Sequence, residues 1–190
     1  PYQRPPLSKD FLLDKTKQEN LILRDDAFFK LKQIDLVLET RVNAIDRRAR
    51  QIVLEDNSRL DFSKLFLGTG SHARRLAIPG SDLDGVCYLR SITDAVDLKE
   101  RLRNASEIVV IGGGFIGLEV AASTSKLGKK VTIIESASRL LERAVSPIVS
   151  QFLLDLHKRH GVDVRLRETV AGVEGRDGRA AFVTTQTGAC

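Results

Sequence analysis

The stretch from residue 107 to residue 135 constrains the fold of this chain more than any other. Residues 108–111 (IVVI) form an apolar run with the length and composition of a buried strand. A glycine-rich turn follows at residues 112–117 (GGGFIG), then small, helix-forming residues up to Gly128, then a second apolar run at residues 130–134. This order predicts a strand, a helix and a parallel second strand.

The glycine-rich turn fits the pattern G-x-G-x-x-G of dinucleotide-binding proteins. The first glycine of this pattern allows a tight turn, the second lets the backbone approach a pyrophosphate, and the third lets the helix pack closely on the strand. The helix N-terminus then offers free N–H groups and the positive end of its dipole to the phosphates. The candidate contacts in this turn are Gly112, Gly114, Phe115, Ile116 and Gly117.

Glu135 ends the second strand, about 20 residues beyond the glycines, where an acid accepts hydrogen bonds from a ribose 2′-hydroxyl. Its charge would repel a 2′-phosphate, so the sequence predicts a preference for NAD over NADP. The alternative, a glycine-rich turn in another kind of α/β domain, is disfavoured because the complete strand–turn–helix–strand context is present.

Composition excludes several other classes of protein. The 190 residues are 42% hydrophobic and 29% charged, with a net charge of +5 and no dense basic block, so we expect no nucleic-acid partner. No apolar run approaches the length of a membrane span and no signal peptide is present, so we expect a cytoplasmic protein with no membrane partner. Cys87, Cys190 and the three scattered histidines (His72, His157 and His160) have no metal-ligand spacing, so no metal site is expected.

Hydrophobic periodicity and turn residues predict the remaining elements. A turn-rich linker at residues 74–85 suggests a domain boundary, and small residues after a buried run suggest a ligand contact at residues 68–71. The expected strands cover residues 21–23, 34–40, 42–46, 51–54, 60–62, 64–67, 162–166, 169–174 and 180–185, and the expected helices cover residues 26–33, 91–104 and 146–160.

Four stretches together resemble a known family of flavoproteins. They are residues 4–9 (RPPLSK), 65–70, 111–122 and 140–147. The chain resembles the FAD- and NADH-dependent reductases that supply electrons to ferredoxins or rubredoxins, as in aromatic-ring dioxygenase and P450 systems. This family lies within the pyridine nucleotide-disulfide oxidoreductases, and the chain is more distantly similar to apoptosis-inducing factors.

The resemblance implies a Rossmann-like, three-layer α/β fold with an antiparallel β-meander. Residues 1–84 would be part of a domain that binds FAD, and residues 85–190 would be a nearly complete domain that binds NAD. The family's flavin-facing catalytic pair would be Lys9 and Glu119. The further contacts that the resemblance implies are Arg4, Val42, Thr69, Gly70 and Arg74 to FAD, and Arg143 beside Glu135 to NAD.

The activity implied for the whole protein is hydride transfer from NADH to FAD, followed by single-electron transfer to a ferredoxin or rubredoxin. Two alternatives stay open. One is a flavoenzyme that reduces disulfides or oxygen, although residues 4–9 carry no cysteine; the other is a non-catalytic module that senses NAD.

The chain also departs from the family pattern. It contains no methionine, begins at Pro1, and lacks the family's amino-terminal glycine motif, later FAD segment and C-terminal domain. We therefore expect an internal piece of a longer protein that does not hold FAD tightly and is inactive by itself. A milder departure is Gly68 in place of the alanine in the family's Ala-Thr-Gly turn.

Overall fold

The computed structural model describes residues 1–189, so the predicted role of Cys190 lies outside the described residues. The chain forms two compact units. Unit 1 comprises Pro1–Ile22 and the chain from Ala73 onward, and unit 2 comprises Leu23–His72. Unit 2 is therefore an insertion in the sequence of unit 1, and these units do not coincide with the predicted division at residue 84.

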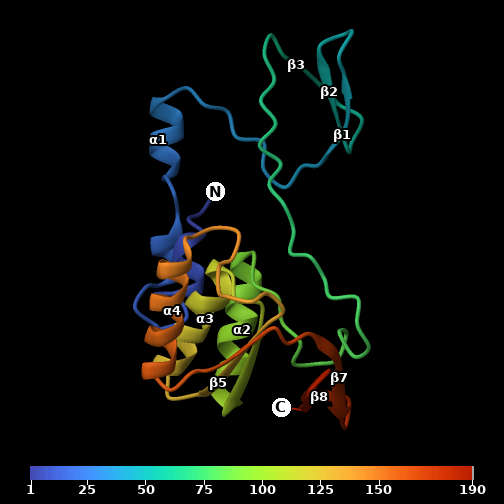
Figure 1. The fold of residues 1–190 in the computed structure, drawn as a ribbon. Helices are drawn as coiled ribbons and strands as arrows, with labels where there is room; N and C mark the ends of the chain where they lie inside the picture. The colour runs from blue at the N-terminus through green and yellow to red at the C-terminus, as the bar shows by residue number, and fades with distance from the viewer. Residues whose placement is uncertain (190) are drawn as a thin grey trace. The chain divides into compact units, whose positions relative to one another are not determined.

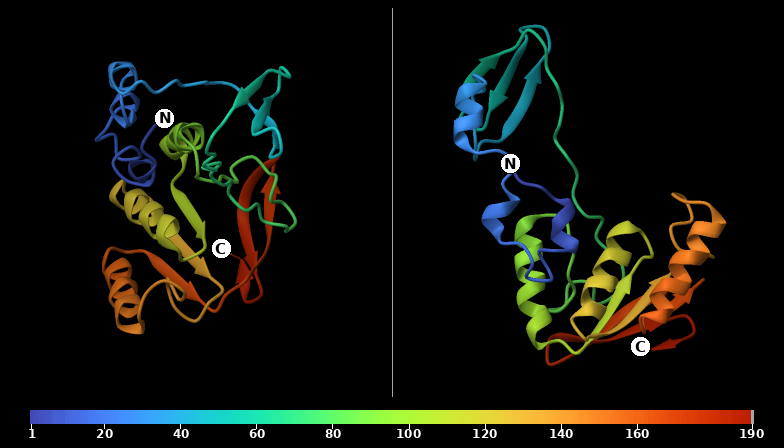
Figure 2. Two further views of the ribbon diagram at one scale, coloured as in Figure 1. Left: turned by 90° about the horizontal axis from the view of Figure 1, so that it is seen from above. Right: turned by 90° about the vertical axis from the view of Figure 1, so that its left-hand side faces the viewer.

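A three-stranded parallel sheet organises unit 1 (Figure 1). Its order is β4-β5-β6, and the helices that connect the strands lie on one side of it (Figure 2). The elements are β4 (Glu107–Ile111), α3 (Phe115–Lys126), β5 (Lys130–Glu135), α4 (Pro147–Arg159) and β6 (Asp163–Leu166). The strand, glycine turn, helix and strand predicted from residues 107–135 are thus confirmed.

The main core lies between the sheet and these two helices. Ile133, at the centre of β5, is fully buried, as is Leu140 in the turn that follows β5. Small residues on α3, among them Ala121, let this helix lie close to the strands. The other buried members are Val110, Leu118, Val131, Leu141, Val162 and Val164.

The amino-terminal segment packs on a second, smaller core. Its buried members are Leu7, Phe11, Leu21 and Ala95. The elements here are the short 3-10 helices η1 (Pro5–Ser8) and η2 (Gln18–Leu21) and the helix α2 (Ile92–Asn104). α2 begins with a capping box, in which the Ser91 side chain accepts from the Asp94 N–H and the Asp94 carboxylate accepts from the Ser91 N–H. No helix among residues 1–189 is long and apolar enough to cross a membrane.

An antiparallel sheet completes unit 1, on the other side of the parallel sheet from α3 and α4 (Figure 2). It consists of β7 (Val170–Arg176), β8 (Arg179–Thr185) and β9 (Gly188–Ala189). The end of the predicted linker docks on it: the Val173 N–H donates to the Pro79 carbonyl at 2.9 Å, and the Ala180 N–H donates to the Asp84 carbonyl at 2.7 Å. The parallel sheet, with helices on one side and antiparallel strands on the other, confirms the expected fold class.

Unit 2 contains an antiparallel meander and one short helix. The elements are α1 (Asp26–Leu31), β1 (Val42–Asp46), β2 (Gln51–Leu54) and β3 (Arg59–Asp61). The meander confirms its prediction, as does α1, whose N-cap Asp25 accepts a hydrogen bond from the Phe28 N–H at 2.8 Å. Leu54 is the only buried residue of unit 2.

Three predicted strands are wrong. Residues 21–23 end a 3-10 helix, and only Ile22 forms an isolated bridge, to Tyr2. Residues 34–40 and 64–67 form no strand, although their apolar content suits one. A strand needs a neighbouring backbone to satisfy its N–H and C=O groups, and the structure pairs no strand among residues 1–189 with either segment.

Candidate dinucleotide site

The glycine turn leaves β4 in a conformation that suits glycine alone. Gly112 has a φ of +107°, and its N–H donates to the Ile134 carbonyl at 2.8 Å, which ties the turn to β5. Gly114 is the N-cap residue of α3 and has no side chain to accept from the helix N–H groups. The first turn of α3 therefore offers unsatisfied donors and the positive end of the helix dipole.

The second and third glycines of the motif lie in different steric surroundings, so a side chain at each position would have a different effect. A Cβ atom on Gly114 would meet nothing within 4 Å, which leaves open space beside the N-terminus of α3. A Cβ atom on Gly117 would lie 2.1 Å from the Gly112 carbonyl oxygen and 3.2 Å from Val110 Cγ1. The predicted roles of close ligand approach at Gly114 and of helix–strand packing at Gly117 fit this geometry.

Glu135 lies at the end of β5 and faces the glycine turn. Its Oε2 accepts from the Gly113 N–H at 2.6 Å, and its Oε1 accepts from the Ala137 N–H at 2.7 Å. The Ser136 hydroxyl donates to Oε1 at the longer distance of 3.3 Å. An ionised carboxylate has about four acceptor positions, so capacity remains for a ribose hydroxyl.

The remaining predicted NAD contacts lie in the first turn of α3 and in the segment between β5 and α4. Phe115 and Ile116, in the first turn of α3, are 58% and 51% exposed, so large apolar side chains border the helix N-terminus. Arg143 is exposed in the segment between β5 and α4. The main chain of that segment is tied to the glycine turn, because the Leu141 N–H donates to the Gly113 carbonyl at 3.0 Å.

A second polar cluster joins α3 to the proline loop. Lys9 Nζ donates to Glu119 Oε1 at 2.9 Å in a partly exposed ion pair, and the Ser8 hydroxyl donates to Glu119 Oε2 at 2.5 Å. One helical turn further on, the buried Ser123 hydroxyl donates to the Ser8 carbonyl at 2.7 Å. The family resemblance paired Lys9 with Glu119 but gave no role to Ser8 or Ser123, although Ser8 lies in the RPPLSK stretch beside Lys9.

The predicted FAD contacts belong to both units. Arg4, at the N-cap of η1, is exposed in unit 1, as is Arg74. Val42, Thr69 and Gly70 are exposed in unit 2, and Gly70 has a φ of +72°. Contact of these five residues with a single flavin nucleotide stays a prediction.

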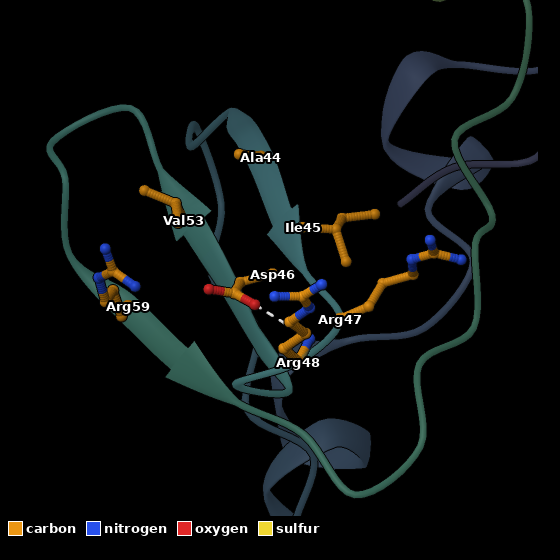
Figure 3. Close-up of a pocket in the computed structure, with 7 residues that line it drawn as sticks. All are labelled: Ala44, Ile45, Asp46, Arg47, Arg48, Val53 and Arg59. Atoms are coloured by element: carbon orange, nitrogen blue, oxygen red, sulfur yellow. Dashed lines mark hydrogen bonds between the residues drawn. The ribbon is translucent and has the colours of Figure 1, made fainter.

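Unit 2 carries a concave pocket with a volume of about 440 Å³ and a basic lining (Figure 3). It is lined by Ala44, Ile45, Asp46, Arg47, Arg48, Val53 and Arg59. Asp46 Oδ1 accepts from the Arg48 N–H at 3.0 Å and from the Ala49 N–H at 2.9 Å, so this acid holds the turn between β1 and β2. Arg47 and Arg48 are exposed on this turn and Arg59 is exposed in β3, and none of the candidate site residues lines this pocket.

The βαβ geometry, the open helix N-terminus and the acid that ends β5 are the features of a dinucleotide-binding α/β fold. Residues 1–189 match the family model described as pyridine nucleotide-disulphide oxidoreductase, and the chain belongs to this family.

Individual relatives extend this result. The chain is 43% identical to the rhodocoxin reductase of Rhodococcus erythropolis and 38% identical to the rubredoxin-NAD(+) reductase of Pseudomonas putida. Both matches cover 99% of the present chain. It spans 44% and 49% of those two relatives, respectively. The crystal structure of the ferredoxin reductase for the CYP199A2 system from Rhodopseudomonas palustris is similar with a TM-score of 0.94 and 34% identity, over 99% of this chain and 46% of that one.

Proposed function

We propose that this chain is part of a flavoprotein that transfers hydride from NADH to FAD and then single electrons to a ferredoxin or rubredoxin. The observation that carries the proposal is the ion pair between Lys9 and Glu119, which joins the proline loop to the nucleotide-binding helix. A site that only held NAD would not require this link. The names of the relatives, as reductases of ferredoxin and rubredoxin, support the same activity.

Unit 1 supplies the elements for NADH. The donors at the start of α3 would hold the pyrophosphate, and Glu135 would accept from the adenosine ribose, with Arg143 as a further contact. Phe115 and Ile116 would exclude water from one side of the site. Glu119, held by two donors, would orient the nicotinamide end.

The flavin would contact the exposed cations of the proline loop. Arg4 and Lys9 would face FAD, with Val42, the Thr69-Gly70 turn and Arg74 as further contacts, so that residues 1–84 contribute to FAD binding and residues 85–190 to NAD binding. When bound, FAD would supply the step between two-electron and one-electron chemistry. The role of Lys9 would be to place a positive charge beside the flavin, where it favours the reduced, anionic form.

The alternatives make different predictions for particular residues. Thiol chemistry would need a reactive cysteine, whereas burial raises the pKa of the Cys87 thiol and keeps it protonated. A pure NAD sensor would bind NADH without needing Lys9 or Glu119. The iron–sulfur partner and the cytoplasmic location stay predictions.

The test is reduction of FAD by NADH in the full-length protein, followed by absorbance in a stopped-flow instrument. We expect Glu119→Gln, which keeps the size of the side chain but removes its charge, to slow reduction by about tenfold or more. Gln151→Glu, on the exposed face of α4, is a control that changes a charge away from the pair. If NADH binds to the wild-type protein but does not reduce its flavin, the sensor alternative is correct and the proposal fails.

A further inference from the structure

We propose that Gly113, the middle residue of the glycine turn, is a specificity-determining residue that keeps Glu135 in position to select NADH over NADPH. This inference rests on the proposed NADH site and adds a residue to it. The motif leaves this position free, so the spacing of G-x-G-x-x-G gives Gly113 no role.

The main chain of Gly113 binds both of the segments that flank the site. Its N–H donates to Glu135 Oε2 at 2.6 Å, and its carbonyl accepts from the Leu141 N–H at 3.0 Å. With the Ala137 N–H on Oε1, the carboxylate of Glu135 has a main-chain donor on each oxygen. Two fixed donors hold the carboxylate in one orientation, and a hydrogen bond to a charged group is stronger than a neutral one.

A side chain at Gly113 would occupy the space that Glu135 and Leu140 now fill. A Cβ atom there would lie 2.6 Å from Leu140 Cδ2, 3.2 Å from Glu135 Oε2 and 3.3 Å from Glu135 Cβ. Leu140 is fully buried, so its side chain can relieve the 2.6 Å contact only by a small shift within the core. The Glu135 side chain is only half-buried and must also move, by a few tenths of an ångström.

The backbone conformation of Gly113 is one that alanine can adopt, so the effect of Gly113→Ala on Glu135 is not caused by backbone strain. Gly112 has a positive φ and Gly113 does not, so alanine at position 113 is compatible with the backbone. The consequence of the substitution is the displacement of the carboxylate from its donor. A displaced carboxylate accepts less well from the 2′-hydroxyl of NADH and repels the 2′-phosphate of NADPH less strongly, so the preference falls.

The experiment is titration of the protein with NADH and NADPH, followed by nucleotide fluorescence. We expect Gly113→Ala to reduce the preference for NADH by about tenfold. Gly114→Ala is the matched control: its Cβ atom meets no protein atom, so it should weaken both nucleotides alike and leave their ratio unchanged. In a Glu135→Ala background, Gly113→Ala should change the ratio no further, because it acts through Glu135.

Each outcome has one meaning. If the wild-type protein does not bind NADH, the proposed function fails. If it binds and Gly113→Ala keeps the wild-type ratio, or Gly114→Ala changes the ratio as much, the inference on Gly113 is overturned. Should Gly113→Ala not fold, Gly113→Ala combined with Leu140→Val decides: valine lacks the Cδ2 atom that the new Cβ atom would meet, so only the contacts with Glu135 remain, and a wild-type ratio would overturn the inference whereas a reduced preference for NADH would support it.

Discussion

The two units use apolar residues in opposite ways. In unit 1, apolar runs such as residues 108–111 pair with neighbouring strands and pack under helices. In unit 2, a similar run at residues 64–67 forms no strand, and Phe66 is 93% exposed. An apolar run therefore predicts the capacity to form a buried strand, and the strand itself depends on a partner backbone.

The largest expected difference between the units concerns their apolar side chains. Ile133→Ala should lower the free energy of unfolding of unit 1 by about 4 kcal/mol, because it leaves a cavity in a fully buried position. Phe66→Ala should change it by less than about 0.5 kcal/mol, because the side chain is exposed. Hydrogen exchange of the β4 and β5 amides measures the change in the free energy of unfolding of unit 1 for both substitutions. Equal effects of the two substitutions would contradict the comparison.

A pair of glycines sharpens the contrast. Gly117→Ala should destabilise the sheet of unit 1 by about 2–3 kcal/mol, since the new Cβ atom would lie 2.1 Å from a main-chain oxygen. Gly68→Ala in unit 2 is the matched control, because its nearest neighbour would be the Phe66 ring at 3.4 Å. Urea unfolding followed by circular dichroism would show a lower midpoint for Gly117→Ala alone. A wild-type midpoint for that variant would mean that α3 can move away from β4 at little cost.

Helix caps give a smaller effect. Ser91→Ala removes the side-chain acceptor from the capping box of α2 and should cost about 1 kcal/mol in thermal unfolding of unit 1. Asp25→Ala removes the equivalent cap from α1, which has no buried residue, so its loss should fray that helix without lowering the main transition. A large shift of the main transition by Asp25→Ala would show that α1 supports the core.

The smallest expected effect is a dependence on pH. Burial, and secondarily the nearby His160, lowers the pKa of His157, which lies near the end of α4. The unfolded chain therefore binds a proton on His157 more tightly than the folded chain does. The stability of unit 1 should be highest above about pH 6.5 and should fall as the pH drops from there through the lowered pKa of His157. His157→Gln should reduce this slope in thermal unfolding measured at several pH values, and His72→Gln, at an exposed position in unit 2, should not. Equal slopes for the two variants would contradict this assignment.

The features of the fold and site that depend on neighbouring residues could be predicted from the sequence. The glycine turn, the meander and the helices α1 and α2 follow from residues close together in the chain, and all were predicted. The contacts that were missed join distant residues. The Ser123 hydroxyl donates to the Ser8 carbonyl, 115 positions away in the sequence. Leu140 fills the space in which a Cβ atom on Gly113 would lie, and only the folded chain brings these two residues together.

The bond between Lys9 and Glu119 has a consequence for how the chain is made. The two residues are 110 positions apart, and the whole of unit 2 lies between them. A ribosome that adds about 5–20 residues per second needs roughly ten seconds to reach α3 after the proline loop has emerged. The loop therefore has no partner for its charged end throughout that time, and closing so long a loop adds an entropic cost that local turns avoid. We expect the proline loop to reach its native place only after α3 has been made.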